Sequence, residues 1–283
     1  MRRTKRAYRA LLWLLLAASL AAAALAGLRL WGIAQDAARA ERLLWEMRQT
    51  ARAGASGPAS AGTPPDASQS APAQNEPDKP VPDASSQAAP APSHQCPIDF
   101  DALRARYPDV VAWLTGCGGE IDTPVVQGAD NQHYLSHLPD GTQNRLGAAF
   151  LDSENSARFT DDQSFLFGHH MDTGGGVFSP LLQYRDAAYR GESPAFALHT
   201  PDGCYSAEVF AAFVIEARAY PYQREFPSAG EMQAFLAEVC ARSELSPPLR
   251  QEPGDRVLTL CTCTSKTSDL RYVVCTRLTP LAD

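Results

Sequence analysis

The chain has 283 residues, of which 45% are hydrophobic and 20% are charged, and its formal net charge is −7. This length suffices for one domain of ordinary size with appended segments. The acidic balance, with no long basic run beyond the first nine residues, argues against a nucleic-acid-binding surface, which would cluster Lys and Arg on one face. We therefore expect peptides or proteins as partners, and no nucleic acid.

The N-terminal region predicts a membrane anchor. Five basic residues within positions 1–9 precede an uncharged, apolar stretch at 10–28, about the 20 residues that a helix needs to cross a bilayer. Positive charge on this flank alone predicts a cytoplasmic tail, a single transmembrane span and an extracellular remainder. A cleavable signal peptide is the competing interpretation, because residues 24–26 have the small-x-small form of a cleavage site. The length of the apolar stretch favours the uncleaved anchor.

Two segments without a predicted globular core follow. Residues 29–52 place Leu43, Leu44 and Met47 at helical spacing, which predicts a juxtamembrane helix, expected to be a solvated stalk. Residues 53–97 are rich in Ala, Pro, Ser and Gln and hold ten of the 22 prolines. Such a composition buries too little apolar surface to fold and predicts a disordered linker. An extended linker of this kind would hold the folded part well away from the membrane.

The folded part is expected at 98–283 and to be mainly β. It opens with a helix over 98–107 that Pro108 ends. A second helix is predicted after Ser228, which forms a capping box with Glu231, and Phe235 belongs to its buried stripe. Between and after these, short apolar runs bounded by Gly, Pro, Asn and Asp predict strands at 121–127, 147–151, 164–168, 194–199, 204–215, 257–263 and 271–278. A closed β-barrel with added helices fits this pattern.

Three residues carry candidate chemistry. An apolar, β-branched strand delivers Cys263, a polar loop follows, and Arg271 opens the next strand. His169 stands where an upstream apolar strand gives way to a Gly-rich loop. A thiol with a pKa of about 8.5 is only a few per cent thiolate at neutral pH, so a catalytic cysteine needs a neighbouring histidine or arginine. Arginine also offers two parallel donors to an oxyanion. The pattern predicts a Cys/His/Arg acyl-transfer site.

The same residues carry a family resemblance. The pentad at 259–263, Arg271 eight residues beyond the cysteine, and the strand–Gly–His–x–Met pattern at 165–171 resemble a sortase. The stretches at 107–114, 121–128, 130–135, 147–152 and 176–178 are similar to a class B sortase domain. The resemblance covers about residues 98–279. It implies a sortase-type closed β-barrel with an N-terminal helix and a helix inserted between late barrel strands.

The resemblance also implies roles. Cys263 would attack the Thr carbonyl of a C-terminal sorting motif, Arg271 would stabilise the oxyanion, and His169 would serve as general acid and base. The substrate-binding residues implied are Asn131 and Leu135 in the groove segment, and Cys261 and Thr262 beside the nucleophile. The chain would be a membrane-anchored cysteine transpeptidase of the thiol-protease type, acting on sorting-motif-bearing surface proteins or pilins. Its acceptor would be an amine of a peptidoglycan precursor or of a pilin, and no cofactor is required.

Several residues compete for these roles. Cys261 is the rival nucleophile and replaces the serine commoner in the family, while His170 is the fallback base. His133 and His137 stand four apart but lack a third ligand at suitable spacing, so no metal site is predicted. Arg277 follows Arg271 on the same strand face and serves as a control. The segment of Tyr220, Pro221 and Tyr222 either forms part of the groove wall or packs against the rest of the domain.

Other interpretations stay open. Seven cysteines in an extracellular chain fit one catalytic thiol plus up to three disulfides, whose pairing the sequence does not assign. A hydrolytic cysteine peptidase would use the same dyad with water as acceptor. A catalytically idle surface-binding module would keep the barrel without a reactive thiol, and the intact Cys, His and Arg argue against it.

Overall fold

A computed structural model describes residues 2–53, 96–171, 175–220, 222–243, 245, 255–264 and 269–281, with the backbone alone for 2–12, 187 and 263. Its helices and strands are α1 (Arg2–Ala53), α2 (Phe100–Arg106), β1 (Val110–Gly116), β2 (Ile121–Val126), β3 (Ala149–Leu151), β4 (Gln163–Phe167), α3 (Ala187–Glu192), β5 (Ala195–Thr200), β6 (Gly203–Glu216), α4 (Ala229–Arg242), β7 (Arg256–Cys263) and β8 (Leu270–Pro280). Three short 3₁₀ helices, η1 (Cys117–Gly119), η2 (His133–Leu135) and η3 (Ser179–Arg185), lie between them.

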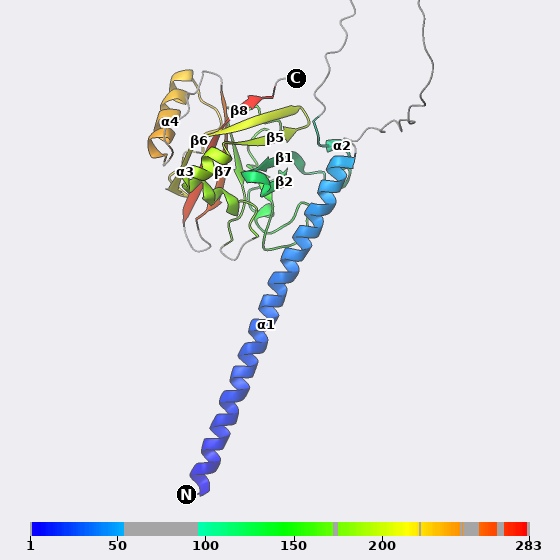
Figure 1. The fold of residues 1–283 in the computed structure, drawn as a ribbon, viewed down its shortest axis with the longest axis vertical. Helices are drawn as coiled ribbons and strands as arrows, with labels where there is room; N and C mark the ends of the chain where they lie inside the picture. Colours follow the sequence, from blue (N-terminus) through cyan, green and yellow to red (C-terminus); the bar gives the residue numbers. More distant parts are fainter. Residues whose placement is uncertain are drawn as a thin grey trace, which may run out of the picture.

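The strands close into a barrel in the order β1-β2-β3-β4-β7-β8-β6-β5 (Figure 1). Closure pairs both edges of every strand, so this sheet has no open edge. Most neighbours are antiparallel, but β2 pairs with β3, and β4 with β7, in parallel. The prediction of a mainly β, closed barrel is confirmed.

Strand β1 is the barrel strand that the sequence did not predict. Its first five residues are all buried. Ala112 and Leu114 contribute to the barrel interior, whereas Val110 and Trp113 pack in a second cluster together with α1 and α2. Because both faces are covered, the alternation that identifies a half-exposed strand is missing.

The two predicted helices of the folded part are confirmed. Asp99 caps α2 by accepting a hydrogen bond from the Ala102 N–H at 2.9 Å. Ser228 caps α4 and accepts from the Glu231 N–H at 3.3 Å. The apolar stripe of α4, including Phe235, packs with residues of β6, β7 and β8. Helix α4 is therefore the helix inserted between late barrel strands, here β6 and β7 (Figure 1).

Helix α1 unites the predicted anchor and the predicted juxtamembrane helix. It runs without interruption for 52 residues, about 80 Å at 1.5 Å per residue. Its N-terminal part projects away from the barrel (Figure 1), and Trp13, Leu20, Leu25 and Trp31 are exposed along it. Residues 13–53 form a helix long and apolar enough to cross a membrane. The apolar surface on this part is unusual for a helix in water.

The C-terminal half of α1 packs on the barrel and is not a solvated stalk. Ala40, Leu43, Met47 and Ala51, three or four residues apart, form one helical face, and all four are buried. They share a hydrophobic cluster with α2 and β1. The expectation of a solvated stalk is thus wrong: the spacing that predicts the helix also predicts an apolar stripe, and the stripe has a partner in the barrel wall.

Polar contacts fix this helix in place. Arg48 donates to the Asp122 carbonyl through Nη2 at 2.6 Å and pairs with the Asp122 carboxylate through Nε at 2.9 Å. Asp122 also accepts from Trp113 Nε1 at 2.7 Å. The Asp99 N–H donates to the Ala51 carbonyl at 2.8 Å. The end of α1 therefore contacts the start of the folded part. The predicted linker, 53–97, lies largely outside the described residues.

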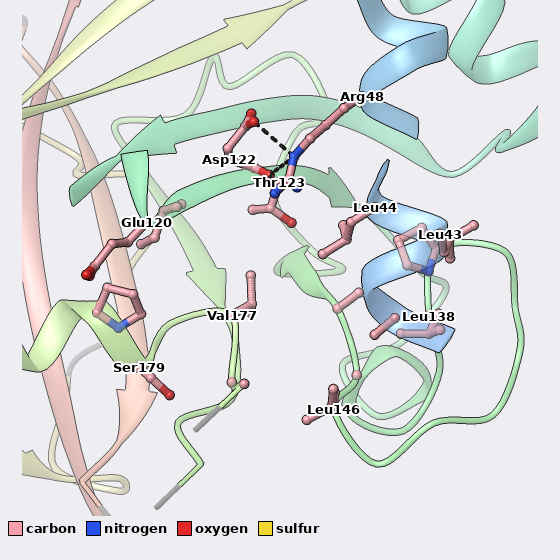
Figure 2. A pocket seen from close by; sticks show the side chains of 18 of the residues that line it. Leu43, Leu44, Arg48, Glu120, Asp122, Thr123, Leu138, Leu146, Val177 and Ser179 are labelled. Atoms are coloured by element: carbon pink, nitrogen blue, oxygen red, sulfur yellow. Dashed lines mark hydrogen bonds and ion pairs between the residues drawn. The ribbon is translucent and has the colours of Figure 1, made fainter. Parts of the chain in front are cut away.

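A cavity of about 470 Å³ lies between α1 and the barrel wall (Figure 2). Leu43 and Leu44 of α1 face it from one side, and Val177 lines it from the loop after β4. The Arg48–Asp122 ion pair lies at its wall. Its described lining carries no thiol and no imidazole, so it is not the acyl-transfer site that the sequence predicts.

Replacement of Met47 by Ala tests the docking of α1. The side chain is fully buried, so we expect a loss of about 2–4 kcal/mol in unfolding free energy, measured by calorimetry on the full-length chain in detergent. Trp45→Ala on the same helix is the control, because Trp45 is 61% exposed. Equal effects of the two changes would contradict the packed interface.

Candidate active site

Three strands bring the predicted catalytic residues to one end of the barrel. Because β4 runs parallel to β7, with Phe167 opposite Cys261, both strands end on the same side. Beyond β4, the Gly168 N–H donates to the Cys261 carbonyl at 3.3 Å, and Thr262 Oγ1 donates to the Gly168 carbonyl at 2.8 Å. His169 therefore leaves β4 directly beside the end of β7.

Strand β8 returns from the same end. Its antiparallel pairing with β7 sets Cys263 opposite Arg271. Residues opposite each other in such a pair share a face, with Cβ atoms about 4.5–5.5 Å apart. Cys261 is two residues away on β7 and shares that face by alternation. The thiol of Cys263 lies outside the described part of the structure, so the backbone register alone places this residue.

His169 is held by its ring and by its backbone. Its Nε2 lies 2.7 Å from the carbonyl oxygen of Leu135, in η2. A carbonyl only accepts, so Nε2 carries a proton and Nδ1 is the nitrogen left to exchange one. The His169 carbonyl accepts from the Phe178 N–H at 3.0 Å. Gly168 is required before it, because a Cβ there would lie 2.7 Å from Val177 Cγ1.

Most of the predicted site residues line one cavity of about 210 Å³. Six of the seven predicted site residues line it: Asn131, Leu135, His169, Cys261, Thr262 and Arg271. The seventh, Cys263, is the cross-strand partner of Arg271. The remaining lining residues are Phe150, Phe167, Gly168, Ala217 and Tyr222. The cavity thus combines an imidazole, a guanidinium and a buried thiol with an aromatic wall.

Comparison with known proteins identifies the fold and its relatives. No protein-family model matches the chain. The chain is 31% identical over 161 residues to Sortase B of Listeria monocytogenes, covering 57% of this chain and 65% of that protein. It is 26% identical over 164 residues to Sortase B of Staphylococcus aureus, covering 58% and 67%. It therefore spans about two thirds of the length of these relatives.

Solved structures of sortase B proteins have a similar fold. The Staphylococcus aureus sortase B–substrate complex superposes with a TM-score of 0.61 at 25% identity, over 65% of this chain and 85% of that one. A Bacillus anthracis protein similar to sortase B gives 0.59 at 27% identity, over 65% and 83%. In sequence and in fold, the chain is similar to class B sortases.

The competing histidines and Arg277 lie outside the cavity. His170 turns toward Ser179, with Nδ1 3.2 Å from its Oγ, and does not line the cavity. Arg277 forms ion pairs with Glu208 and Asp255 at 2.8 and 3.7 Å. His133 and His137 stack on each other with ring centroids 4.1 Å apart.

In the aromatic segment at 220–222, Tyr220 is a packing residue, whereas Tyr222 forms part of the cavity wall. Tyr220 is buried in the core, and its hydroxyl accepts a hydrogen bond from Gln163 Nε2 at 2.7 Å. Tyr222 lines the cavity. Burial and the neighbouring Cys261 thiol raise the pKa of Tyr222, so its phenol stays protonated at neutral pH and able to donate. Pro221 lies outside the described residues.

A buried carboxylate that the sequence reasoning missed organises the wall of this cavity. Asp152 accepts from Asn131 Nδ2 at 3.0 Å and from Arg224 Nη2 at 2.9 Å. The Asn131 side-chain oxygen in turn accepts from the Ser153 N–H at 2.8 Å. Both ends of the Asn131 amide are therefore engaged in holding the loop, and Asn131 shapes the cavity through this network. The sequence offered no signal for the Asp152–Arg224 pair, because 72 positions separate the partners.

Replacement of Thr262 by Val tests the link between β7 and His169. The change keeps the side-chain shape but leaves the buried Gly168 carbonyl without this donor, so we expect a loss of about 1–3 kcal/mol in unfolding free energy. The imidazole NMR resonances of His169 should also shift. Thr276→Val is the matched control, because Thr276 Oγ1 donates to the Leu258 carbonyl at 2.9 Å, remote from the cavity. Unchanged His169 resonances in Thr262→Val would contradict the link.

Proposed function

We propose that this sortase is a cysteine transpeptidase that cleaves a C-terminal sorting motif after Thr and transfers the acyl group to an amine. The observation that carries the proposal is the cavity shared by His169 and Arg271 at the end of the strand that delivers Cys263. The named substrate complex of the Staphylococcus relative adds support, because that protein binds a substrate.

The first half-reaction forms a thioester. The Cys263 thiolate attacks the Thr carbonyl carbon, and the carbonyl oxygen takes up the negative charge. Arg271, opposite in the β7–β8 register, donates hydrogen bonds to that oxyanion. When the intermediate collapses, the peptide C–N bond breaks, and protonated His169 gives its proton to the leaving amine.

The second half-reaction releases the enzyme. Neutral His169 takes a proton from the incoming amine, whose nitrogen attacks the thioester carbon and expels the Cys263 thiolate. The acceptor would be an amine of a peptidoglycan precursor or a pilin lysine. Phe150, Phe167 and Tyr222 give the cavity apolar walls, which restrict the access of water to the thioester.

We propose that α1 anchors the enzyme in the cell membrane, with its N-terminus in the cytoplasm and the barrel outside. Contacts of the barrel with α1 begin at Asp36, whose carbonyl accepts from Asn144 Nδ2 at 2.8 Å. If the apolar span ends near Leu28, these eight residues add only about 12 Å of helix. The barrel therefore sits close to the membrane surface.

Amine capture tests the activity. The full-length enzyme in detergent micelles is incubated with a library of sorting-motif peptides and excess amine, and products are identified by mass spectrometry. We expect amine-capped peptide from the enzyme and none from Cys263→Ala. Products of hydrolysis alone would favour the cysteine peptidase, and no reaction with any motif would contradict the proposal.

Arginine variants provide the matched control for this assay. Arg271→Lys keeps the charge but loses the parallel donors, so kcat/KM should fall by about 10²–10³. Arg277→Lys on the same strand retains its charge beside Glu208 and should leave kcat/KM nearly unchanged. Equal losses in both variants would remove Arg271 from the mechanism.

Protease protection tests the topology. In intact cells producing the chain with tags at both ends, added protease should digest the barrel and its C-terminal tag but spare the N-terminal tag. Membrane extraction should yield an N-terminus upstream of the apolar span. A mature chain beginning at Gly27 would establish a cleaved signal peptide instead.

A further inference from the structure

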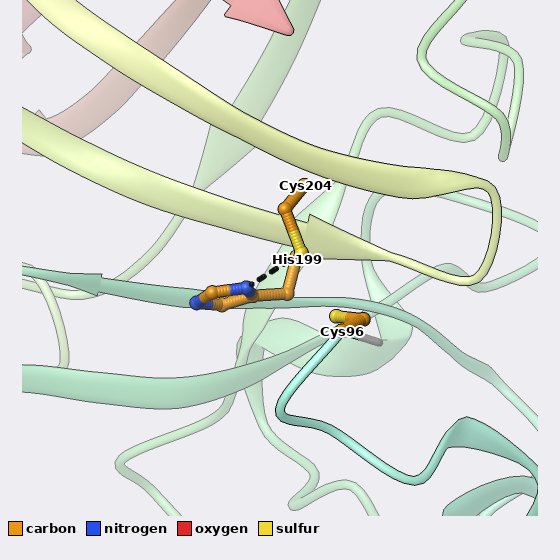
Figure 3. A group of neighbouring side chains, drawn as sticks. All are labelled: Cys96, His199 and Cys204. Atoms are coloured by element: carbon orange, nitrogen blue, oxygen red, sulfur yellow. Dashed lines mark hydrogen bonds between the residues drawn. The ribbon is translucent and has the colours of Figure 1, made fainter. Parts of the chain in front are cut away.

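A second cluster of metal-ligating side chains lies outside the active site. The potential ligand atoms of Cys96, His199 and Cys204 all lie within 4.8 Å of one another (Figure 3). His199 Nδ1 is 3.2 Å from Cys204 Sγ. Each of the three residues is partly buried, and none lines the catalytic cavity. The mechanism proposed above uses none of them.

The barrel topology creates this cluster from distant parts of the chain. His199 and Cys204 are directly opposite each other on the β5–β6 hairpin. Cys96 lies on the segment that enters α2 and packs against the cluster formed by α1, α2 and β1. The hairpin is bound to β1 through the pairing of His199 with Trp113. Three segments fixed by separate contacts therefore converge on one point.

The ligand set indicates a particular class of metal. We propose that Cys96, His199 and Cys204 bind one Zn²⁺ ion, with a solvent molecule as the fourth ligand. Zinc prefers thiolate sulfur at about 2.3 Å and imidazole nitrogen at about 2.0–2.1 Å in a tetrahedral arrangement. Those bond lengths place the sulfur and nitrogen ligand atoms about 3.5–3.8 Å apart, which the observed spacing accommodates. With no carboxylate in the group, Mg²⁺ and Ca²⁺ are disfavoured.

The ion would join the entry segment of the folded part to the barrel. Cys96 precedes α2, and the other two ligands belong to the β5–β6 hairpin. Binding replaces the two thiol protons with metal bonds and stabilises the folded state over the unfolded chain. The consequence is a fixed path for the chain where it enters the barrel beside α1.

A Cys96–Cys204 disulfide is the competing use of the same thiols. It would need an oxidant and would have no need of an imidazole. His199 therefore decides between the two, because zinc requires it and a disulfide does not.

Zinc content of the full-length chain tests the proposal. The protein is purified in detergent under reducing conditions in the Cys263→Ala background, which removes the catalytic thiol as a second ligand. After equilibration with ZnCl₂ and removal of excess metal, elemental analysis should give one zinc per chain. Cys96→Ser, His199→Ala and Cys204→Ser should each reduce the affinity by at least about tenfold. Cys240→Ser and His137→Ala are the controls, since both residues lie outside the cluster.

A spectroscopic measurement keeps the test independent of the variants. Co²⁺ added to the reduced, metal-free protein should produce thiolate-to-cobalt charge-transfer bands and the intense visible bands of a tetrahedral site, and ZnCl₂ should abolish both. Absence of these bands, zinc retention in His199→Ala, or a Cys96–Cys204 disulfide in a chain that takes up no zinc when reduced would each overturn the proposal. Failure of the amine-capture assay would leave this result unaffected.

Discussion

The register between β4, β7 and β8 is the constraint on which the site depends. Parallel pairing of β4 with β7 sends His169 out beside the end of β7, and antiparallel pairing sets Cys263 opposite Arg271. A slip of one residue in the β7–β8 pairing would turn the cysteine to the opposite face. The barrel is closed, so each strand is held on both sides and such a slip would disturb every neighbouring pair. The geometry of catalysis is thus a property of the whole barrel.

The surrounding structure serves this end of the barrel in different ways. Asp152, fixed by Arg224 from the β6–α4 connection, holds the loop of Asn131 against the cavity. On another wall of the barrel, Arg48 of α1 pairs with Asp122 of β2 and attaches α1 to the barrel. Helix α1 and the barrel are thereby coupled mechanically.

Sequence reasoning succeeded where local pattern and local chemistry coincide. The runs at 257–263 and 271–278 show strand character by themselves, and the structure forms β7 and β8 there. The roles of the residues that they carry rest on the resemblance alone. Sequence reasoning failed where burial comes from a distant partner. The spacing of Leu43 and Met47 predicts an apolar stripe but does not show that the barrel wall is its packing partner. Strand β1 lacks alternation because α1 and α2 cover its outer face. The Cys96–His199–Cys204 cluster forms only when the β5–β6 hairpin and the α2 entry segment meet, since about one hundred positions separate Cys96 from the other two residues.

The most direct test of this account is the identity of the acylated residue. The full-length enzyme is mixed with a reactive sorting-motif peptide in the absence of amine, quenched with acid within the first turnover, and digested for peptide mass mapping. We predict a thioester-linked acyl group on Cys263, with an amount that falls when amine is added before the quench. An acyl group on Cys261, which shares the strand face and lines the cavity, would contradict the assignment that the β7–β8 register supports.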